Sequence, residues 1–277
     1  DLIRSCFYMF YFCDKFEFEC KILIHHPIAF FIENYNVSFS SNQNLFKNIQ
    51  MFTHSNLKKY NFTIQNDSNT TNECDLQENI LPDYVDFLTK LPVINNSIYS
   101  YNILFPYDKN IFKFRTIVQQ VFKPTQEMTT FINDEKKQLN IEKKKFIVIH
   151  IRTGDKYLIK KKSTLNNSYV VTITNSIAKI ANYFLKPILI ISDNVEIKHL
   201  IKQKFPNVKI IFNEITHIGE GVELNIHKVK NTMLDFYLMS ESYSIYSFTT
   251  YEHGTGFSYW CSKLYNIPYS CKFINNK

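Results

Sequence analysis

The second half of the sequence predicts an α/β fold built on a parallel sheet. From about residue 141, apolar strand-like runs alternate with amphipathic helix-like stretches, a rhythm that implies right-handed crossovers between parallel strands. The run Phe146–Ile151 is apolar and β-branched, as strands buried on both faces are. A chain of 277 residues can hold two modest domains. We place the boundary near residue 140, with residues 1–140 and 141–277 as the two parts.

The elements expected in the second half follow from apolar spacing and from Pro, Asp and Gly at the boundaries. The strands are Phe146–Ile151, Ile188–Ser192, Val208–Phe212 and Ser244–Ser247, and the helices are Tyr169–Leu185, Val195–Phe205, Thr232–Ser242 and Gly256–Tyr265. In the first half we expect a helix at Thr125–Leu139 capped by Thr125, short helical spacing at Asp83–Leu91, strands at Phe16–Cys20, Ile22–Pro27 and Tyr101–Pro106, and a long surface loop at 54–80.

The strand Phe146–Ile151 ends in a polar segment where chemistry is expected. Ligands of open α/β sheets bind beyond the carboxyl ends of strands, which here carry His150, Arg152, Asp155 and Lys156. Of the 32 Lys and Arg residues only three are arginine, so an arginine kept here suggests that a planar, bidentate anion binder is required. The alternative is that Arg152 pairs with Asp155 as a structural clasp.

Composition limits the function classes. The net charge of +7 comes from scattered lysines, and no basic-and-aromatic interleaving indicates nucleic-acid binding. No Gly-x-Gly-x-x-Gly or P-loop pattern is present. The six cysteines form no C-x-x-C pair, and His25-His26 would point to opposite faces of a strand, so we expect no metal site. The sequence has no apolar run long enough to cross a membrane, and it begins at Asp1, so we expect any leader or anchor to lie outside it.

The segment His150-Ile-Arg-Thr-Gly-Asp-Lys156 resembles the first motif of the fucosyltransferase superfamily, which includes α1,2-, α1,6- and protein O-fucosyltransferases. Two later segments match in the same order. Ile188-Leu-Ile-Ile-Ser-Asp-Asn194 is similar to the second motif, in which a strand ends in Ser/Thr-Asp. Thr232–Ser240 followed by Ser247–Ser258 is similar to the third region, and the resemblance covers roughly residues 110–265.

This resemblance implies a GT-B-like fold, in which two Rossmann-type domains face each other across a cleft. It implies inverting, metal-independent transfer of L-fucose from GDP-fucose to a hydroxyl of a glycan or glycoprotein, with no resident cofactor. Arg152 would be catalytic and would hold the diphosphate, while the nucleoside would be held by His150 and Asp235. The full set of substrate-binding residues implied is His150, Arg152, Thr153, Lys156, Asp193, Asp235, Thr255, Gly256 and Phe257.

Several interpretations stay open at this level. Asp193 could instead cap the helix that starts near Val195, and Thr232-x-x-Asp235 is also a capping-box pattern. Thr249 or Thr250 could replace Thr255 as the phosphate-binding hydroxyl. The family's Gly-rich first strand-loop is absent, so the acceptor is not identified, and no general base can be named. Another nucleotide-sugar transferase, or a catalytically silent nucleotide- or sugar-binding module, remains the alternative. We expect a secretory-pathway lumen (Golgi or ER) if a leader is missing and the cytoplasm otherwise.

Overall fold

The structure is a computed structural model of the 277-residue chain. It describes residues 2–15, 20–24, 27–34, 36–39, 48–51, 97–100, 109–154, 166–216, 225–252 and 254–275. The expected elements at 54–80, Asp83–Leu91 and Tyr101–Pro106 lie outside these ranges. The chain divides into two compact units, residues 1–29 with 33–123 and residues 30–32 with 124–277.

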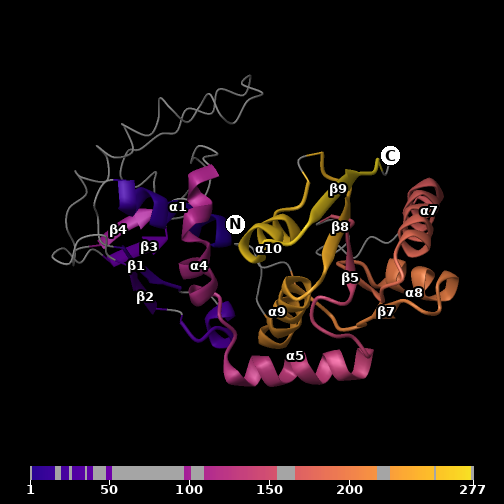
Figure 1. Ribbon diagram of the computed structural model, residues 1–277, viewed down its shortest axis with the longest axis horizontal. Helices are drawn as coiled ribbons and strands as arrows, with labels where there is room; N and C mark the ends of the chain where they lie inside the picture. Colours follow the sequence, from indigo (N-terminus) through magenta and orange to yellow (C-terminus); the bar gives the residue numbers. More distant parts are fainter. Residues whose placement is uncertain are drawn as a thin grey trace. The chain divides into compact units, whose positions relative to one another are not determined.

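The first unit contains a mixed four-stranded sheet in the order β2-β1-β3-β4, shown in indigo and magenta in Figure 1. Strand β1 pairs antiparallel with β2 and parallel with β3, and β3 pairs parallel with β4. Its elements are α1 (Leu2–Lys15), β1 (Cys20–Leu23), η1 (Pro27–Phe31), β2 (Asn36–Phe39), β3 (Asn48–Met51), β4 (Ser97–Ser100), η2 (Lys109–Phe114) and α4 (Arg115–Val121).

Helix α1 anchors the packing of this unit, and no element was expected there from the sequence. Phe7 and Phe10 are fully buried. The Phe7 ring meets Phe112 of η2 edge-on with centroids 5.5 Å apart, and Lys113 pairs with Asp14 at 2.5 Å. None of the described helices is long and apolar enough to cross a membrane.

The second unit contains a five-stranded sheet in the order β7-β6-β5-β8-β9, and every neighbouring pair is parallel. The mixed α/β class and the parallel sheet expected from the sequence are therefore confirmed. Its elements are α5 (Gln126–Leu139), β5 (Ile147–Arg152), α7 (Asn167–Tyr183), β6 (Ile188–Ser192), α8 (Val195–Lys204), β7 (Lys209–Ile210), α9 (Ile226–Ser240), β8 (Ser244–Thr249), α10 (Gly256–Tyr265) and β9 (Tyr269–Phe273).

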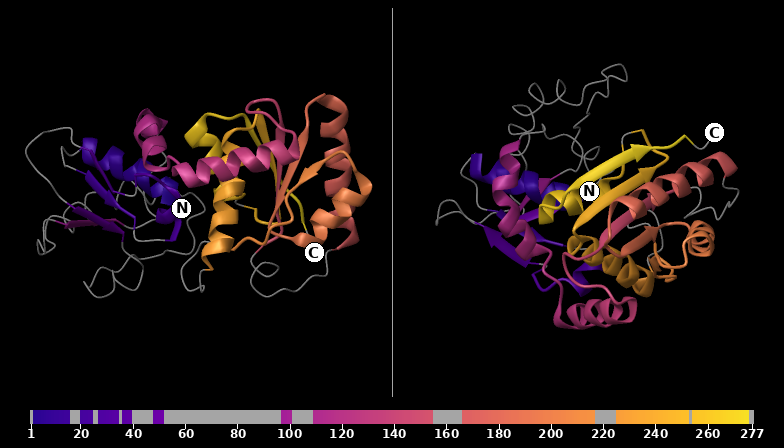
Figure 2. Two further views of the ribbon diagram at one scale, coloured as in Figure 1. Left: turned by 90° about the horizontal axis from the view of Figure 1, so that it is seen from below. Right: turned by 45° about the vertical axis from the view of Figure 1, so that its right-hand side comes forward.

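The helices cover both faces of this sheet. Helices α7 and α8 lie on one face and α9 and α10 on the other, as the views of Figures 1 and 2 show. The chain runs β5, β6, β7 toward one edge and then returns past β5 to β8 and β9, and right-handed crossovers place the two helix pairs on opposite faces. The path thus reverses direction between β5 and β8.

Strand β5 sends alternate side chains to the two faces, as the pleat requires. Ile149 and Ile151 join the apolar cluster formed with Tyr169 and Ile173 of α7 and Ile197 of α8. His150 and Arg152 therefore point to the opposite face, toward α9 and α10. The side of β5 that faces α7 and α8 is therefore apolar and stabilises the sheet. The other side carries polar side chains, which meet those of neighbouring elements.

Helix α5 precedes this sheet and begins as the sequence predicts. Thr125 is its N-cap, and the Met128 N–H donates to Thr125 Oγ1 at 3.2 Å. Two ion pairs join α5 to α9 and the residue after it, Glu127 with Lys230 at 2.8 Å and Lys136 with Glu241 at 2.6 Å. These contacts place α5 in the second unit.

Candidate functional site

The site candidate lies at the carboxyl ends of β5 and β8, where the strand order reverses. Arg152, the last residue of β5, is in register with Thr249, the last residue of β8. In doubly wound sheets the loops after two such strands separate and leave a crevice for ligands. The helix that follows β8, α10, begins at the same edge. The end of β5, the end of β8 and the start of α10 therefore lie at one edge of the sheet, although they are far apart in the sequence.

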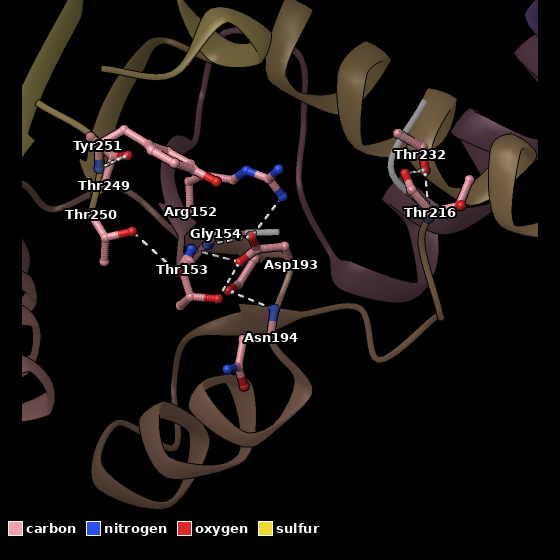
Figure 3. A network of polar contacts seen from close by, with 11 residues as sticks. Arg152, Thr153, Gly154, Asp193, Asn194, Thr216, Thr232, Thr249, Thr250 and Tyr251 are labelled. Atoms are coloured by element: carbon pink, nitrogen blue, oxygen red, sulfur yellow. Dashed lines mark hydrogen bonds and ion pairs between the residues drawn. The ribbon is translucent and has the colours of Figure 1, made fainter. Parts of the chain in front are cut away.

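Asp193, directly after β6, organises the turn that follows β5 (Figure 3). Its Oδ1 accepts from the backbone N–H and the hydroxyl of Thr153, both at 2.8 Å. Its Oδ2 accepts from Arg152 Nη1 at 2.7 Å and from the Gly154 N–H at 3.1 Å. We call this arrangement of Arg152, Thr153, Gly154 and Asp193 the Asp193 turn.

The Asp193 turn fixes the direction of the Arg152 guanidinium. The Asp193 side chain is 2% exposed and the Arg152 side chain 15% exposed, so the ion pair is mostly shielded from water. A planar guanidinium held by one carboxylate loses little further entropy when it binds an anion. The clasp considered from the sequence used Asp155, but Asp155 and Lys156 lie outside the described residues.

Asp193 is not the cap of α8. Asn194 occupies the N-cap position, and its Oδ1 accepts from the Ile197 N–H at 3.1 Å. The interpretation of Asp193 as the cap is therefore wrong, because the capping residue is the next one, Asn194. Since both Asp193 oxygens already accept two hydrogen bonds each, its contribution is to hold Arg152 and the backbone of 153–154 in place.

The end of β8 is joined to the Asp193 turn by its threonines. Thr250 donates from its hydroxyl to the Thr153 carbonyl at 3.1 Å, and from its N–H to the Arg152 carbonyl at 3.2 Å. The Thr249 hydroxyl accepts from the Tyr251 N–H at 3.1 Å. Both threonine hydroxyls are thus engaged in shaping the turns, which favours Thr255 as the hydroxyl available for phosphate.

Gly154 is required where the two turns meet. Its φ is +108°, and an added Cβ would lie 3.3 Å from Tyr251 Oη and 3.4 Å from Thr250 Oγ1. A side chain there would combine backbone strain with crowding. Figure 3 shows Tyr251 extending past Arg152 above this turn.

The N-terminus of α10 lacks the side-chain cap that the other long helices of this unit have. Thr125, Asn166, Asn194 and Asn225 cap α5, α7, α8 and α9 through side-chain oxygens, whereas Thr255 makes no side-chain cap bond to α10. The first turn of α10, which includes Gly256 and Phe257, contains no acidic residue. Helix N-termini present N–H groups and a positive dipole end to anions, so this end is suited to phosphate.

His150 lies under this helix as a neutral ring. It is buried, its Nδ1 lies 3.0 Å from Ser258 Oγ, and its ring centroid is 5.9 Å from that of Phe257. Burial, together with the charge of nearby Arg152, lowers the pKa of His150 to about 3. An uncharged imidazole can hydrogen-bond a ligand without adding charge.

Asp235 lies in the interior of α9 rather than at its start. The helix begins at Ile226 with Asn225 as N-cap, and the Thr232 hydroxyl is bonded within α9 and to Thr216, so the capping-box interpretation is wrong. Asp235 is buried, and its Oδ2 has no hydrogen-bond partner among the described residues. Burial raises its pKa to about 6. An orphaned carboxylate oxygen of this kind is costly without a ligand.

Lys198 of α8 was missed from the sequence. It is 2% exposed, and its Nζ donates to the Ile211 carbonyl at 2.9 Å. Burial lowers its pKa, while the charges of Asp235 and then Asp193 raise it. The lysine thus lies within electrostatic reach of both buried aspartates. The only signal in the sequence was its place between the buried positions Ile197 and Ile201 of the helix.

Among the described residues no group of three or more His, Cys, Asp or Glu side chains could hold a metal ion. No protein-family model matches the chain, and no curated protein sequence does either. Solved structures do match in fold. Those of POFUT1 with GDP and of NodZ α1,6-fucosyltransferase with GDP each give a TM-score of 0.43, at 10% and 13% identity.

The similarity to these fucosyltransferase structures extends over part of each chain. The match covers 72% of this chain and 61% of the POFUT1 chain, and 76% and 64% for the NodZ complex. NodZ from Bradyrhizobium gives a TM-score of 0.42 at 11% identity, over 76% of this chain and 65% of that chain. This chain therefore spans less than two thirds of each of these structures.

Proposed function

We propose that this protein transfers L-fucose from GDP-fucose to a hydroxyl of a glycan or glycoprotein. The observation that supports this most is the pre-positioned Arg152, held by Asp193 at the reversal point of the sheet, beside an α10 N-terminus without a side-chain cap. An oriented guanidinium and free helix N–H groups at one edge suit a diphosphate. A buried, unpartnered Asp235 oxygen suits the N–H donors of a purine base.

In the proposed reaction the bond between the fucose anomeric carbon and the β-phosphate oxygen breaks, and its electrons go to GDP. The acceptor hydroxyl oxygen attacks the anomeric carbon from the opposite side, which inverts it, and its proton is released to solvent. Negative charge grows on the departing phosphate, so Arg152 and the N–H groups of Gly256 and Phe257 stabilise the transition state more than the ground state. Thr255 adds a hydroxyl, and His150 and Asp235 hold the nucleoside.

We further propose the GT-B arrangement of two Rossmann-type domains, with residues 141–277 as the donor domain and residues 1–140 as a reduced acceptor-side domain, apart from α5, which belongs to the second unit. GDP-fucose is the donor substrate, and we expect neither a metal nor another cofactor to be needed. Thr153 and Lys156 complete the donor site in this proposal, with Lys156 as a second cation. The acceptor would be a glycan or glycoprotein, and the proposed compartment is the lumen of the secretory pathway.

A donor-hydrolysis and transfer assay tests this proposal. The protein is incubated with GDP-fucose, GDP-mannose, UDP-glucose or UDP-N-acetylglucosamine, with and without glycan acceptors, and the released nucleoside diphosphate is measured. We expect release from GDP-fucose only, unchanged by excess chelator. Loss of activity with chelator and its recovery with Mn²⁺ would indicate another transferase class. Tight GDP binding without any release would indicate a silent binding module.

A further inference from the structure

A layer of polar side chains, buried at His150, Ser247 and Ser258 and partly exposed on β9, lies between α10 and the strands β5, β8 and β9. His150 of β5 is in register with Ser247 of β8, which is in register with Cys271 of β9. Since residues in register on parallel strands face the same side, these side chains and that of Tyr269, two residues before Cys271, all face α10. Ser258 of α10 completes the layer from above.

Ser258 lies at the centre of this layer and contacts three of its members. Its Oγ is 3.0 Å from His150 Nδ1 and 3.5 Å from Tyr269 Oη, and it donates to Ser247 Oγ at 3.4 Å. Ser258 is 0% exposed and Ser247 is 1% exposed, so these groups have to satisfy one another rather than bulk water.

The number of hydrogens available assigns the protonation of the histidine ring. A serine hydroxyl has one hydrogen and two lone pairs. If the Ser258 hydrogen goes to Ser247, its lone pairs accept from the other two neighbours. Tyr269 can donate, because burial raises its pKa to about 12 and keeps the phenol protonated. With these directions His150 donates from Nδ1. Its ring is neutral, so Nε2 carries no hydrogen.

We propose that Ser258 is a positioning residue that holds His150 as the Nδ1–H tautomer, so that Nε2 accepts a hydrogen bond from a hydroxyl or N–H group of the nucleoside diphosphate. This assignment rests on the proposed function. His150 and Arg152 point to the same face of β5, two residues apart. One strand end thus offers a cation for the diphosphate and an acceptor for the nucleoside. The acceptor, His150 Nε2, depends on Ser258, which also contacts Ser247 of β8 and Tyr269 of β9.

The tautomer is measured first, because it does not depend on activity. The full chain is labelled with ring-¹⁵N histidine, and the His150 signals are assigned by their disappearance in His150→Gln. We expect Nδ1 to show the shift and one-bond coupling of a protonated nitrogen, and Nε2 those of an unprotonated one. The same assignment should be lost or mixed in Ser258→Ala. A protonated Nε2 in the wild type would overturn the proposal.

Binding of GDP is measured next on the same variants. Ser258→Ala should weaken GDP binding about tenfold, the scale of one misplaced hydrogen bond, and Tyr269→Phe should weaken it less. Ser262→Ala is the matched control, because Ser262 is also buried on α10 but donates to the Tyr259 carbonyl. Equal effects of Ser258→Ala and Ser262→Ala would overturn the positioning role. A wild type that binds no GDP would overturn the proposed function, and with it the substrate half of this proposal, whatever the tautomer.

Discussion

The two buried aspartates of the second unit, Asp193 and Asp235, are used in opposite ways. Both Asp193 oxygens accept hydrogen bonds, four in all, from Arg152, Thr153 and Gly154. Asp235 has one oxygen with no partner in the described part of the chain, and burial raises its pKa to about 6. A saturated carboxylate is structural, whereas a buried unsatisfied one indicates a missing partner.

Helices α8 and α10, which start at the same edge of the sheet, differ in the same way. The N-terminus of α8 is closed by the Asn194 side chain, while that of α10 has no side-chain cap. The molecule thus places one closed and one open region next to each other. The closed region, at Asp193 and Asn194, fixes Arg152, and we propose that the open region, at Asp235 and the start of α10, receives the ligand. The predictions below separate these two roles.

Removing the carboxylate of the closed region should have the largest effect. Asp193→Ala leaves Arg152 and two backbone N–H groups without their acceptor, and breaking a buried pair from one side costs roughly 4 kcal/mol of unfolding free energy. Asn194→Ala is the matched control, because it loses only a helix cap, about 1 kcal/mol. Denaturant unfolding measures both variants. Similar losses for the two would mean that Asp193 is not the centre of this turn.

The carboxylate of the open region should make stability depend on pH. Burial raises the pKa of Asp235 from 3.8 to about 6, so the native state holds a proton that the unfolded state has lost. The stability associated with the neutral carboxyl is complete below pH 3.8 and is lost as the pH rises through about 6. Over this window the loss is about 3 kcal/mol.

The comparison of Asp235→Asn with the wild type isolates this group, because Asn stays neutral at every pH. Unfolding free energies at pH 4 and pH 7.5 should differ less in the variant. Asp134→Asn, at an exposed position on α5, is the control and should change nothing. If Asp235 binds the base, GDP should also bind more tightly above pH 6 in the wild type only. A pH profile identical in wild type and Asp235→Asn would contradict the account.

Arg152→Lys separates the two roles of Arg152. A lysine keeps the charge but loses the planar fork that can hold Asp193 and a diphosphate together. Turnover should fall by about 10²-fold, equivalent to about 2.7 kcal/mol, while the melting temperature changes little because Lys can still pair with Asp193. Arg115→Lys, in the first unit, is the control. Near-normal turnover in Arg152→Lys would reduce Arg152 to a structural partner of Asp193.

Much of the fold could be predicted because local signals agreed with tertiary packing. The buried run at β5, the Thr125 cap and the bounds of α10 were all predicted from sequence and are present. Helix α9 begins six residues before its predicted start and ends two residues before its predicted end, because the segment around Asn225 and Ile226 has little apolar spacing. Strand β9 was missed, since its residues are mostly exposed and have no clear alternation. Helix α1 was not predicted.

The residues of the site were easier to predict than their partners. His150, Arg152, Thr153 and Asp193 come together as strand ends of one parallel sheet must. The pairing of Arg152 with Asp193 depends on β5 and β6 being neighbours in the sheet, which no local sequence pattern reveals. Lys198 and Ser258 were missed for a similar reason. Their burial depends on how α8 and α10 pack, and a lone lysine or serine on a helix looks like a surface residue.

Calorimetric titration with GDP and UDP tests the central claim, that the open region holds a guanine nucleotide beside Arg152, most directly. We predict that the wild type binds GDP with a dissociation constant well below 1 mM and UDP at least about tenfold more weakly, a difference of about 1.4 kcal/mol. Asp235→Asn should shrink that difference, whereas Asn194→Ala should leave it unchanged. Equal affinity of the wild type for GDP and UDP would contradict the account.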